Sequence, residues 1–242
     1  MRCAMLRFDA PLMSFGGVLV DQHNRTDRFP GRAMLTGLIA NALGWHHGDA
    51  GALNALQSRI EYAARWDVSP DALRDYHTVD LGQPHLAEPG WTTRGLPEHR
   101  DGGASKKQTH QRYRHYWANG VLTLALALRD SEPDIDAVAS ALTCPARPLF
   151  LGRKTCLPAT RLVLGMRDAD NTLAALAAEP RDARAPLDAE RFEACWPPGC
   201  ADPTRETRQT ERRTDDRDWH MQAHVGMRAM VTGHISEVPP CT

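Results

Sequence analysis

Hydrophobic and polar positions alternate in two stretches of the chain, 59–66 and 120–128, and such alternation predicts β-strands with one buried face. The apolar face of the first stretch carries Ile60, Tyr62, Ala64 and Trp66. The apolar face of the second carries Leu122, Leu124, Leu126 and Leu128. Shorter strands are predicted at 2–8, which opens the chain, and at 161–165. Together these patterns predict four strands distributed over the first 165 residues.

Between these strands the apolar residues recur at helical spacing. Over 34–43 they form one stripe, and Gly44 is suited to end that helix in a left-handed conformation. The stripe consists of Met34, Leu35, Leu38, Ile39, Ala42 and Leu43. A second short helix is predicted over 49–57, with Asp49 as its N-cap. A third follows Pro133, and its apolar positions are Ile135, Val138 and Leu142.

In chain order these elements read β-α-β, a long insertion, and β-α-β. This order predicts an α+β fold over 1–165: a ferredoxin-like, or RRM-like, βαββαβ domain whose sheet offers an open face to RNA. The insertion at 67–118 lies between the second and third strands. It is too long for a turn, so we expect a projecting thumb. Residues 166–242 are expected to form a small, partly β C-terminal region.

Charge and composition narrow the class of protein. The chain has 242 residues, of which 42% are hydrophobic, and a formal net charge of -1. Any nucleic-acid site must therefore arise from local clusters of cations. No apolar run approaches the roughly 20 residues of a membrane helix, and the N-terminus does not resemble a signal peptide. We expect a cytoplasmic protein whose 6 scattered cysteines stay reduced.

The most basic part of the chain lies within the insertion, between Trp91 and Tyr116. Its cations are Arg94, Arg100, Lys106, Lys107, Arg112 and Arg114. Tyrosine and histidine rings interleave with them, and together cations and rings suit phosphates and stacked bases. The competing interpretation is an ordinary solvated loop, which is what charged runs usually form.

A second candidate is the turn-rich loop at 11–17, which is followed by Arg25, Arg28 and Arg32. Backbone amides near its glycines can approach phosphates, and arginines one turn apart at a helix start can hold an anion. The alternative is a surface loop with routine charges. The loop is neither a GxGxxG nor a P-loop motif, so we expect no nucleotide cofactor.

Cysteines and histidines near the C-terminus raise the question of a metal. Cys195 and Cys200 precede His220 and His224, but the spacing departs from that of zinc fingers, and we expect no bound metal. The chain also lacks the nucleophile-elbow, HExxH and Walker motifs. We expect no cofactor.

Four segments together resemble one family. They are Leu6–Gly16, Thr26–Gly44, the run Leu73-Arg74-Asp75-Tyr76-His77-Thr78-Val79, and the turn Leu149–Pro158 with its sequence LFLGRKTCLP. In this order and spacing they are similar to the fifth family of CRISPR-associated (Cas) proteins, part of the RAMP superfamily, in its type I-E form. The third segment closely resembles that family's RDYHTV signature, and the fourth its YLGRKSCPL turn.

The resemblance implies a non-catalytic role in a CRISPR surveillance complex (Cascade) that serves antiviral defence. The protein would cap the 5′ handle of CRISPR RNA, contact the backbone and large subunits, and meet target DNA only through the complex. The residues implied to contact RNA come from the loop, the arginines after it, the signature, the thumb and the turn. They are Met13, Ser14, Phe15, Gly16, Arg25, Arg28, Arg32, Arg74, His77, Arg94, Lys106, Lys107, Arg112, Arg114, Arg153 and Lys154.

Two other functions stay open at this point. Members of the family in another subtype cut the repeat RNA without a metal, and Tyr76, His77, His115 and Tyr116 have side chains suited to such acid–base chemistry. The second open function is that of an unrelated RRM-like RNA binder, although RNP-type aromatic motifs are missing from the predicted strands.

Overall fold

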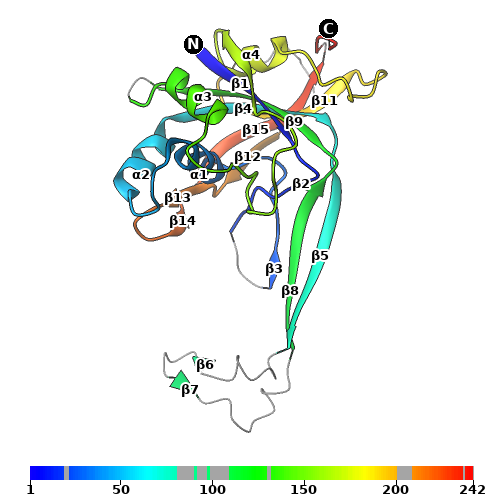
Figure 1. Cartoon of the computed structure of the whole chain (residues 1–242). Coiled ribbons are helices and arrows are strands. Elements are labelled where there is room, and N and C mark those ends of the chain that lie inside the picture. The colour runs from blue at the N-terminus through cyan, green and yellow to red at the C-terminus, as the bar shows by residue number, and fades with distance from the viewer. Residues whose placement is uncertain are drawn as a thin grey trace. The chain divides into compact units, whose positions relative to one another are not determined.

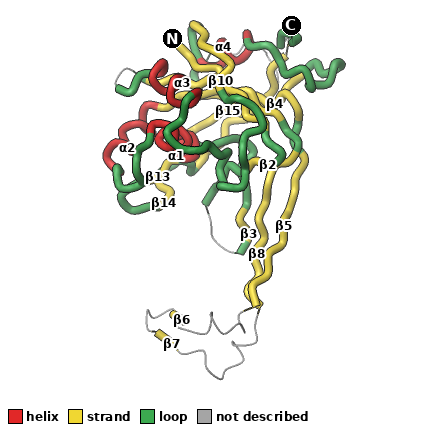
Figure 2. Tube along the Cα trace, viewed as in Figure 1, coloured by secondary structure: helices red, strands yellow, loops and turns green. Residues whose placement is uncertain are grey.

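The structure is a computed structural model that describes residues 1–18, 22–80, 90–91, 97–98, 109–129, 132–200, 209–236 and 238–241. It divides into two compact units (Figures 1 and 2). The first comprises Met1–Val18, Thr26–Leu73 and Tyr116–Thr242, and the second comprises Leu19–Arg25 and Arg74–His115. Among the described residues, no helix is both long enough and apolar enough to cross a membrane.

The described part of the first unit is built on one seven-stranded sheet with the order β10-β1-β9-β4-β11-β15-β12. All neighbouring strands in it pair antiparallel. The strands are β1 (Arg2–Asp9), β4 (Ile60–Val68), β9 (Val121–Leu128), β10 (Val163–Asp168), β11 (Arg191–Trp196), β12 (Gln209–Arg213) and β15 (Arg228–Ser236). A short hairpin of β13 (Asp216–Asp218) and β14 (Ala223–Val225) lies before β15.

Helices cover both faces of this sheet. They are α1 (Arg32–Leu43), α2 (Ala50–Arg59), α3 (Ile135–Thr143) and α4 (Thr172–Ala178). Since successive strand residues point to opposite faces, β1 divides its side chains between two cores. Leu6 packs in the cluster that includes the apolar residues of α1 and α3. Met5 packs in a second cluster with Leu173 and Leu176 of α4.

Every strand and helix predicted from the periodicity over 1–165 is confirmed, with boundaries shifted by a few residues. Gly44 ends α1 with φ 80°, as expected, and its amide reaches the carbonyls of Ala40 and Asn41. Asp49 does occupy the N-cap of α2, but its carboxylate accepts a hydrogen bond from the amide of His46 at 2.8 Å instead of from the helix.

The prediction that one face of the sheet is open to RNA is wrong, because α4 and the segment after it cover that face. Alanines at 63, 125 and 127 have no measurable or almost no exposure, and their small size lets α4 approach the sheet closely. Arg65, which the alternation places on the polar face of its strand, is 0% exposed. The alternation in 59–66 therefore marks two buried faces of different polarity and not one buried and one wet face.

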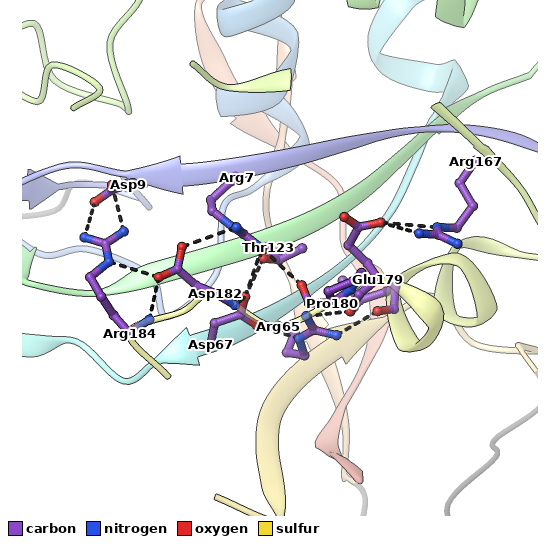
Figure 3. A network of polar contacts seen from close by, with 11 residues as sticks. Arg7, Asp9, Arg65, Asp67, Thr123, Arg167, Glu179, Pro180, Asp182 and Arg184 are labelled. Carbon is purple, nitrogen blue, oxygen red and sulfur yellow. Dashed lines mark hydrogen bonds and ion pairs between the residues drawn. The ribbon is translucent and has the colours of Figure 1, made fainter. Parts of the chain in front are cut away.

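A polar network holds this cover in place (Figure 3). The guanidinium group of Arg65 donates to the Leu176 carbonyl at 2.7 Å and the Glu179 carbonyl at 3.1 Å, at the end of α4. It also donates to Asp67 at 2.6 Å. Asp67 in turn accepts from the amide of Asp182 at 2.8 Å. The network adds side-chain donors to carbonyls at the end of α4, where a helix runs out of its own backbone donors.

Residues after 166 do not stand apart from the rest of the first unit. β11 pairs with β4, and β15 and β12 continue the sheet beyond it. Phe192 and Trp196 of β11 fill the α4-side core. The C-terminal residues thus supply part of the sheet and part of its second core.

The second unit contains most of two long paired strands, β5 (Asp71–Asp80) and β8 (Thr109–Ala118). The short strand β3 (His23–Asn24) runs parallel to β8, with His23 opposite Tyr113. A two-stranded pair of β6 (Gly90–Trp91) and β7 (Pro97–Glu98) lies further along the insertion. In the first unit, β2 (Leu12–Met13) pairs with the last residues of β8.

Candidate nucleic-acid interface

The loop after β1 is fastened to the turn at 149–158, so two segments singled out in the sequence meet. The amide of Ser14 donates to the Leu151 carbonyl at 3.1 Å. On its other side, the amide of Phe15 donates to the Thr26 hydroxyl at 2.9 Å, and the amide of Asp27 to the Gly16 carbonyl at 2.9 Å. These bonds fix the backbone of 14–17.

The side chains of this loop mostly point into the protein. Met13, Ser14 and Phe15 are 0%, 2% and 4% exposed, and the rings of Phe15 and Trp66 lie 6.1 Å apart. What the loop presents to a ligand is therefore chiefly its backbone near Gly16, whose φ of 79° suits glycine. The sequence alone gave no sign that Met13 and Phe15 belong to the core.

Arg28 and Arg32 are each engaged by a carboxylate. Arg28 donates from Nε to Glu193 at 2.9 Å, and its guanidinium carbon lies 5.2 Å from the Trp66 ring and 4.9 Å from the Trp117 ring. Arg32 donates from Nε to Asp216 at 2.7 Å. These pairs tie the start of α1 to β11 and to the β13–β14 hairpin. The two guanidinium groups do not form the joint anion cradle that their spacing suggested.

The turn at 149–158 also carries two of the predicted cationic contacts. Arg153 lies over the ring of Tyr116, with 4.6 Å between the guanidinium carbon and the ring centroid, and Lys154 is exposed. Tyr116 itself is only 4% exposed. Tyr116, one of the four residues proposed for acid–base chemistry, is therefore covered, and its ring lies against a cation instead.

In the second unit, aromatic and cationic side chains collect around Tyr113. We call His23, Arg74, Tyr76 and Tyr113 the Tyr113 cluster. The His23 ring stacks on Tyr113 at 4.6 Å between centroids and 8° between planes. The Tyr76 ring lies 5.1 Å from Tyr113, and the Arg74 guanidinium lies 5.3 Å above it. Such an arrangement of flat rings and a cation suits unstacked bases.

The other predicted contacts on β5 and β8, at His77, Arg112 and Arg114, alternate with the cluster residues along the strands and so point to the opposite face. His77 faces Asp75, with 2.6 Å between Nε2 and the carboxylate. Arg112 donates from Nε to His110 at 3.0 Å, and Arg112 and Arg114 alternate with Tyr113 along β8. Arg25, next to β3, is exposed. Arg94, Lys106 and Lys107 lie outside the described residues.

A cavity of about 430 Å³ opens beside the loop at 14–17, wholly within the first unit. We call it the α1 cavity, because α1 forms one wall. The other walls come from the loop, from 147–153 and from the β13–β14 hairpin with Trp219. The sequence did not indicate this cavity, because its lining residues are spread along the chain from Ser14 to His224.

The cysteine–histidine set does not gather. Cys195 is buried in the α1-side core, where burial raises the pKa of its thiol to about 12. Among the residues that the structure describes, no group of three or more His, Cys, Asp or Glu side chains is placed to hold a metal ion.

Comparisons with known proteins agree on one family. The profile of the CRISPR-associated Cas5 proteins matches residues 3–231. The CRISPR system Cascade subunit CasD of Escherichia coli (strain K12) is 32% identical over 181 residues, which cover 71% of this chain and 74% of CasD. A chain from a solved CRISPR RNA-guided surveillance complex has a TM-score of 0.69 and 26% identity, covering 99% of this chain and 91% of that one. A solved Cas protein at 18% identity shares the fold, with a TM-score of 0.61 over 99% of this chain and 98% of that one.

Proposed function

This chain belongs to the Cas5 family of CRISPR-associated proteins, and we propose that it is the subunit of a type I-E surveillance complex that binds and caps the 5′ handle of CRISPR RNA. The observation that carries the proposal is its 32% identity to a Cascade subunit. The surveillance-complex chain that it matches along 99% of its length supports the same assignment.

We assign the elements β1-α1-β4 and β9-α3-β10 to a ferredoxin-like unit. Their strands lie in the order β10-β1-β9-β4, all antiparallel, as expected when two β-α-β halves interleave. Because α4 covers one sheet face and α1 and α3 cover the other, RNA binding falls to the loops at one edge and to the second unit.

The loop at 14–17 is the proposed seat of the handle backbone. Its amides and carbonyls are fixed by Leu151 and Thr26, so its shape is set before RNA arrives. Arg153 and Lys154 supply positive charge from the adjoining turn. Arg28 and Arg32 are positioning residues in this account, because Glu193 and Asp216 already engage their guanidinium groups.

The second unit is the proposed thumb. The Tyr113 cluster offers rings for bases, and Arg25, Arg112 and Arg114 offer charge for phosphates. The predicted cations Arg94, Lys106 and Lys107 extend this role. The backbone and large subunits of the complex are the proposed protein partners, and target DNA is reached through them.

A non-catalytic role is favoured over endoribonuclease activity. His77 is held by Asp75, and Tyr116 is buried beneath Arg153. Tyr116 is therefore shielded from a substrate. A carboxylate beside an imidazole can support acid–base chemistry, so for His77 the RNA incubation below decides between the two functions.

Incubating the full chain with repeat RNA and a chelator tests the two functions against each other. We expect binding without cleavage, and binding should weaken steeply with salt. Charge reversal at Lys106, Lys107 and Arg112 should lower RNA retention at moderate salt. Cleavage at one fixed position would instead support the nuclease, and unchanged retention would remove the thumb from the binding surface.

A further inference from the structure

A glycine in the middle of α1 lines the α1 cavity. Gly37 lines the cavity from α1, and an added Cβ there would meet only Cη2 of Trp219, at 3.9 Å. That separation is ordinary van der Waals contact, so packing does not demand glycine. Glycine is a poor helix residue in such a position. A larger side chain at position 37 would extend into the space between α1 and Trp219.

Trp219 is held rigidly on the opposite wall. Its indole Nε1 donates to Gln57 at 3.2 Å, and its backbone amide donates to Asn54 at 3.2 Å. The guanidinium carbon of Arg217 lies 5.5 Å from its ring. With its polar atoms bonded toward α2, Trp219 presents hydrocarbon to the cavity. The wall is thus set in advance for a flat or apolar ligand.

Polar atoms without hydrogen-bond partners gather around the same cavity. Among the described residues, four that line it each keep one buried polar atom unpaired within the protein: Ser14 Oγ, Arg147 Nε, Arg217 Nε and His224 Nδ1. Burying such atoms unpaired costs folding free energy. The two arginine Nε–H groups can only donate, and the serine and histidine can also donate. The cavity therefore suits a ligand edge that carries acceptors.

These features point to one kind of occupant. A phosphate would satisfy the donors but would lose its hydration against Met34, Leu38 and Phe150, which also line the cavity. An apolar side chain of a partner protein would fill the space but leave the donors unpaired. A nucleobase offers both a flat apolar face and an edge of carbonyl oxygens and ring nitrogens.

We propose that the α1 cavity receives one unstacked nucleobase of the bound RNA, and this inference rests on the proposed function. The loop at 14–17, the proposed seat of the RNA backbone, forms part of the cavity wall. A strand that lies on that loop can turn a single base inward. The volume of about 430 Å³ is in the range of small-ligand pockets and leaves room for one base.

The first test is an abasic scan on the full chain. The probe is a short synthetic RNA with the 5′-end sequence of the RNA that co-purifies with the protein, each nucleotide replaced in turn by an abasic ribose. We expect one position to stand out, with binding weakened at least about fivefold, as for the loss of a stacked base. An even loss across all positions would overturn the pocket while leaving RNA binding intact. No binding of any probe would overturn both the pocket and the proposed function.

The second test fills the cavity with the variant Gly37→Leu. We expect it to weaken binding of the intact RNA about as much as the critical abasic position does, and the two changes together should cost little more than either alone. The matched control is Gly51→Leu, because Gly51 lies in α2 with open space around it and does not line the cavity.

Thermal unfolding of both variants separates a filled cavity from a damaged fold, and the abasic scan of the unchanged protein needs no variant at all. If Gly37→Leu binds RNA as the control does, the base pocket is wrong. If it also loses association with another subunit of the complex, the occupant is a protein side chain, which contradicts the proposal.

Discussion

Gly152 lies against the backbone of Ser14 so closely that a Cβ at position 152 would sit 1.5 Å from the Ser14 carbonyl oxygen. Gly152 also has φ 96°, a conformation that only glycine adopts readily. Through this contact the turn at 149–158 supports the loop after β1, which is the proposed seat of the RNA.

The variant Gly152→Ala should therefore displace the loop. We expect it to lose about 1–3 kcal/mol of stability from backbone strain, or more where the clash cannot relax, together with RNA retention. Urea unfolding and RNA binding measure the two effects. The control is Gly165→Ala in β10, where an added Cβ meets nothing within 4 Å. Equal behaviour of the two variants would mean that the close approach does not matter.

Replacing Arg65 by leucine should be severely destabilising. The change removes the donors to the end of α4 and leaves the fully buried Asp67 without its closest cation. Loss of one partner from a buried pair costs roughly 3–5 kcal/mol. The double variant Arg65→Leu with Asp67→Leu should recover part of the loss in chemical unfolding. No recovery would mean that the carbonyl contacts, and not the charge pair, dominate.

Acid should weaken the contact between Arg184 and Asp182. Burial raises the pKa of Asp182, but hydrogen bonds and charge from Arg184 outweigh it, so the pKa lies below its ordinary 3.8. A lowered carboxyl pKa adds stability above pH of about 4, and that stability is lost as the pH falls through the folded-state pKa.

The variant Arg184→Gln removes this effect. It should be less stable than the unchanged protein near pH 7, and the difference should shrink as the pH falls below about 4. Unfolding curves across this range measure it, and a difference that stays constant with pH would contradict the account.

The variant Gly37→Ala should stabilise the protein by up to about 1 kcal/mol, because alanine favours the helix and its methyl group has room. Gly51→Ala in α2 should do the same, since nothing lies within 4 Å of its added Cβ. Chemical unfolding compares the two. A loss of stability in the first alone would show that the wall beside Trp219 tolerates no methyl group.

The Tyr113 cluster should contribute to RNA binding through its rings. Tyr113→Ala should weaken binding by about 1–3 kcal/mol, the range for a base stacked on an aromatic ring. Tyr113→Phe keeps the ring and should bind nearly as the unchanged protein does. If both variants bind alike and normally, the cluster is structural.

Much of the first unit was predictable from periodicity. Side chains such as Leu122 and Leu124 identify their strand because both point into one core. The second core was not predictable, since alanines at 125 and 127 and the charged Arg65 resemble a wet face. Only the segment around α4, more than forty residues further along the chain, makes that face dry.

The candidate site was predictable in part and for different reasons. The glycine of the turn at 149–158 was identified within a motif, but the contact between Gly152 and Ser14 depends on tertiary structure. Arg28 and Arg32 appeared free, because Glu193 and Asp216 are distant in sequence. Trp219 belongs to no periodic pattern, and only the tertiary fold brings the β13–β14 hairpin beside α1, so the α1 cavity could not be predicted from the sequence.

The central claim is tested most directly by purifying the protein with its associated partners and sequencing the 5′ ends of the bound RNA. The account predicts one uniform, repeat-derived 5′ end, which charge reversal at Arg153 and Lys154 should deplete. RNA with heterogeneous 5′ ends, or no RNA in an otherwise assembled complex, would contradict it.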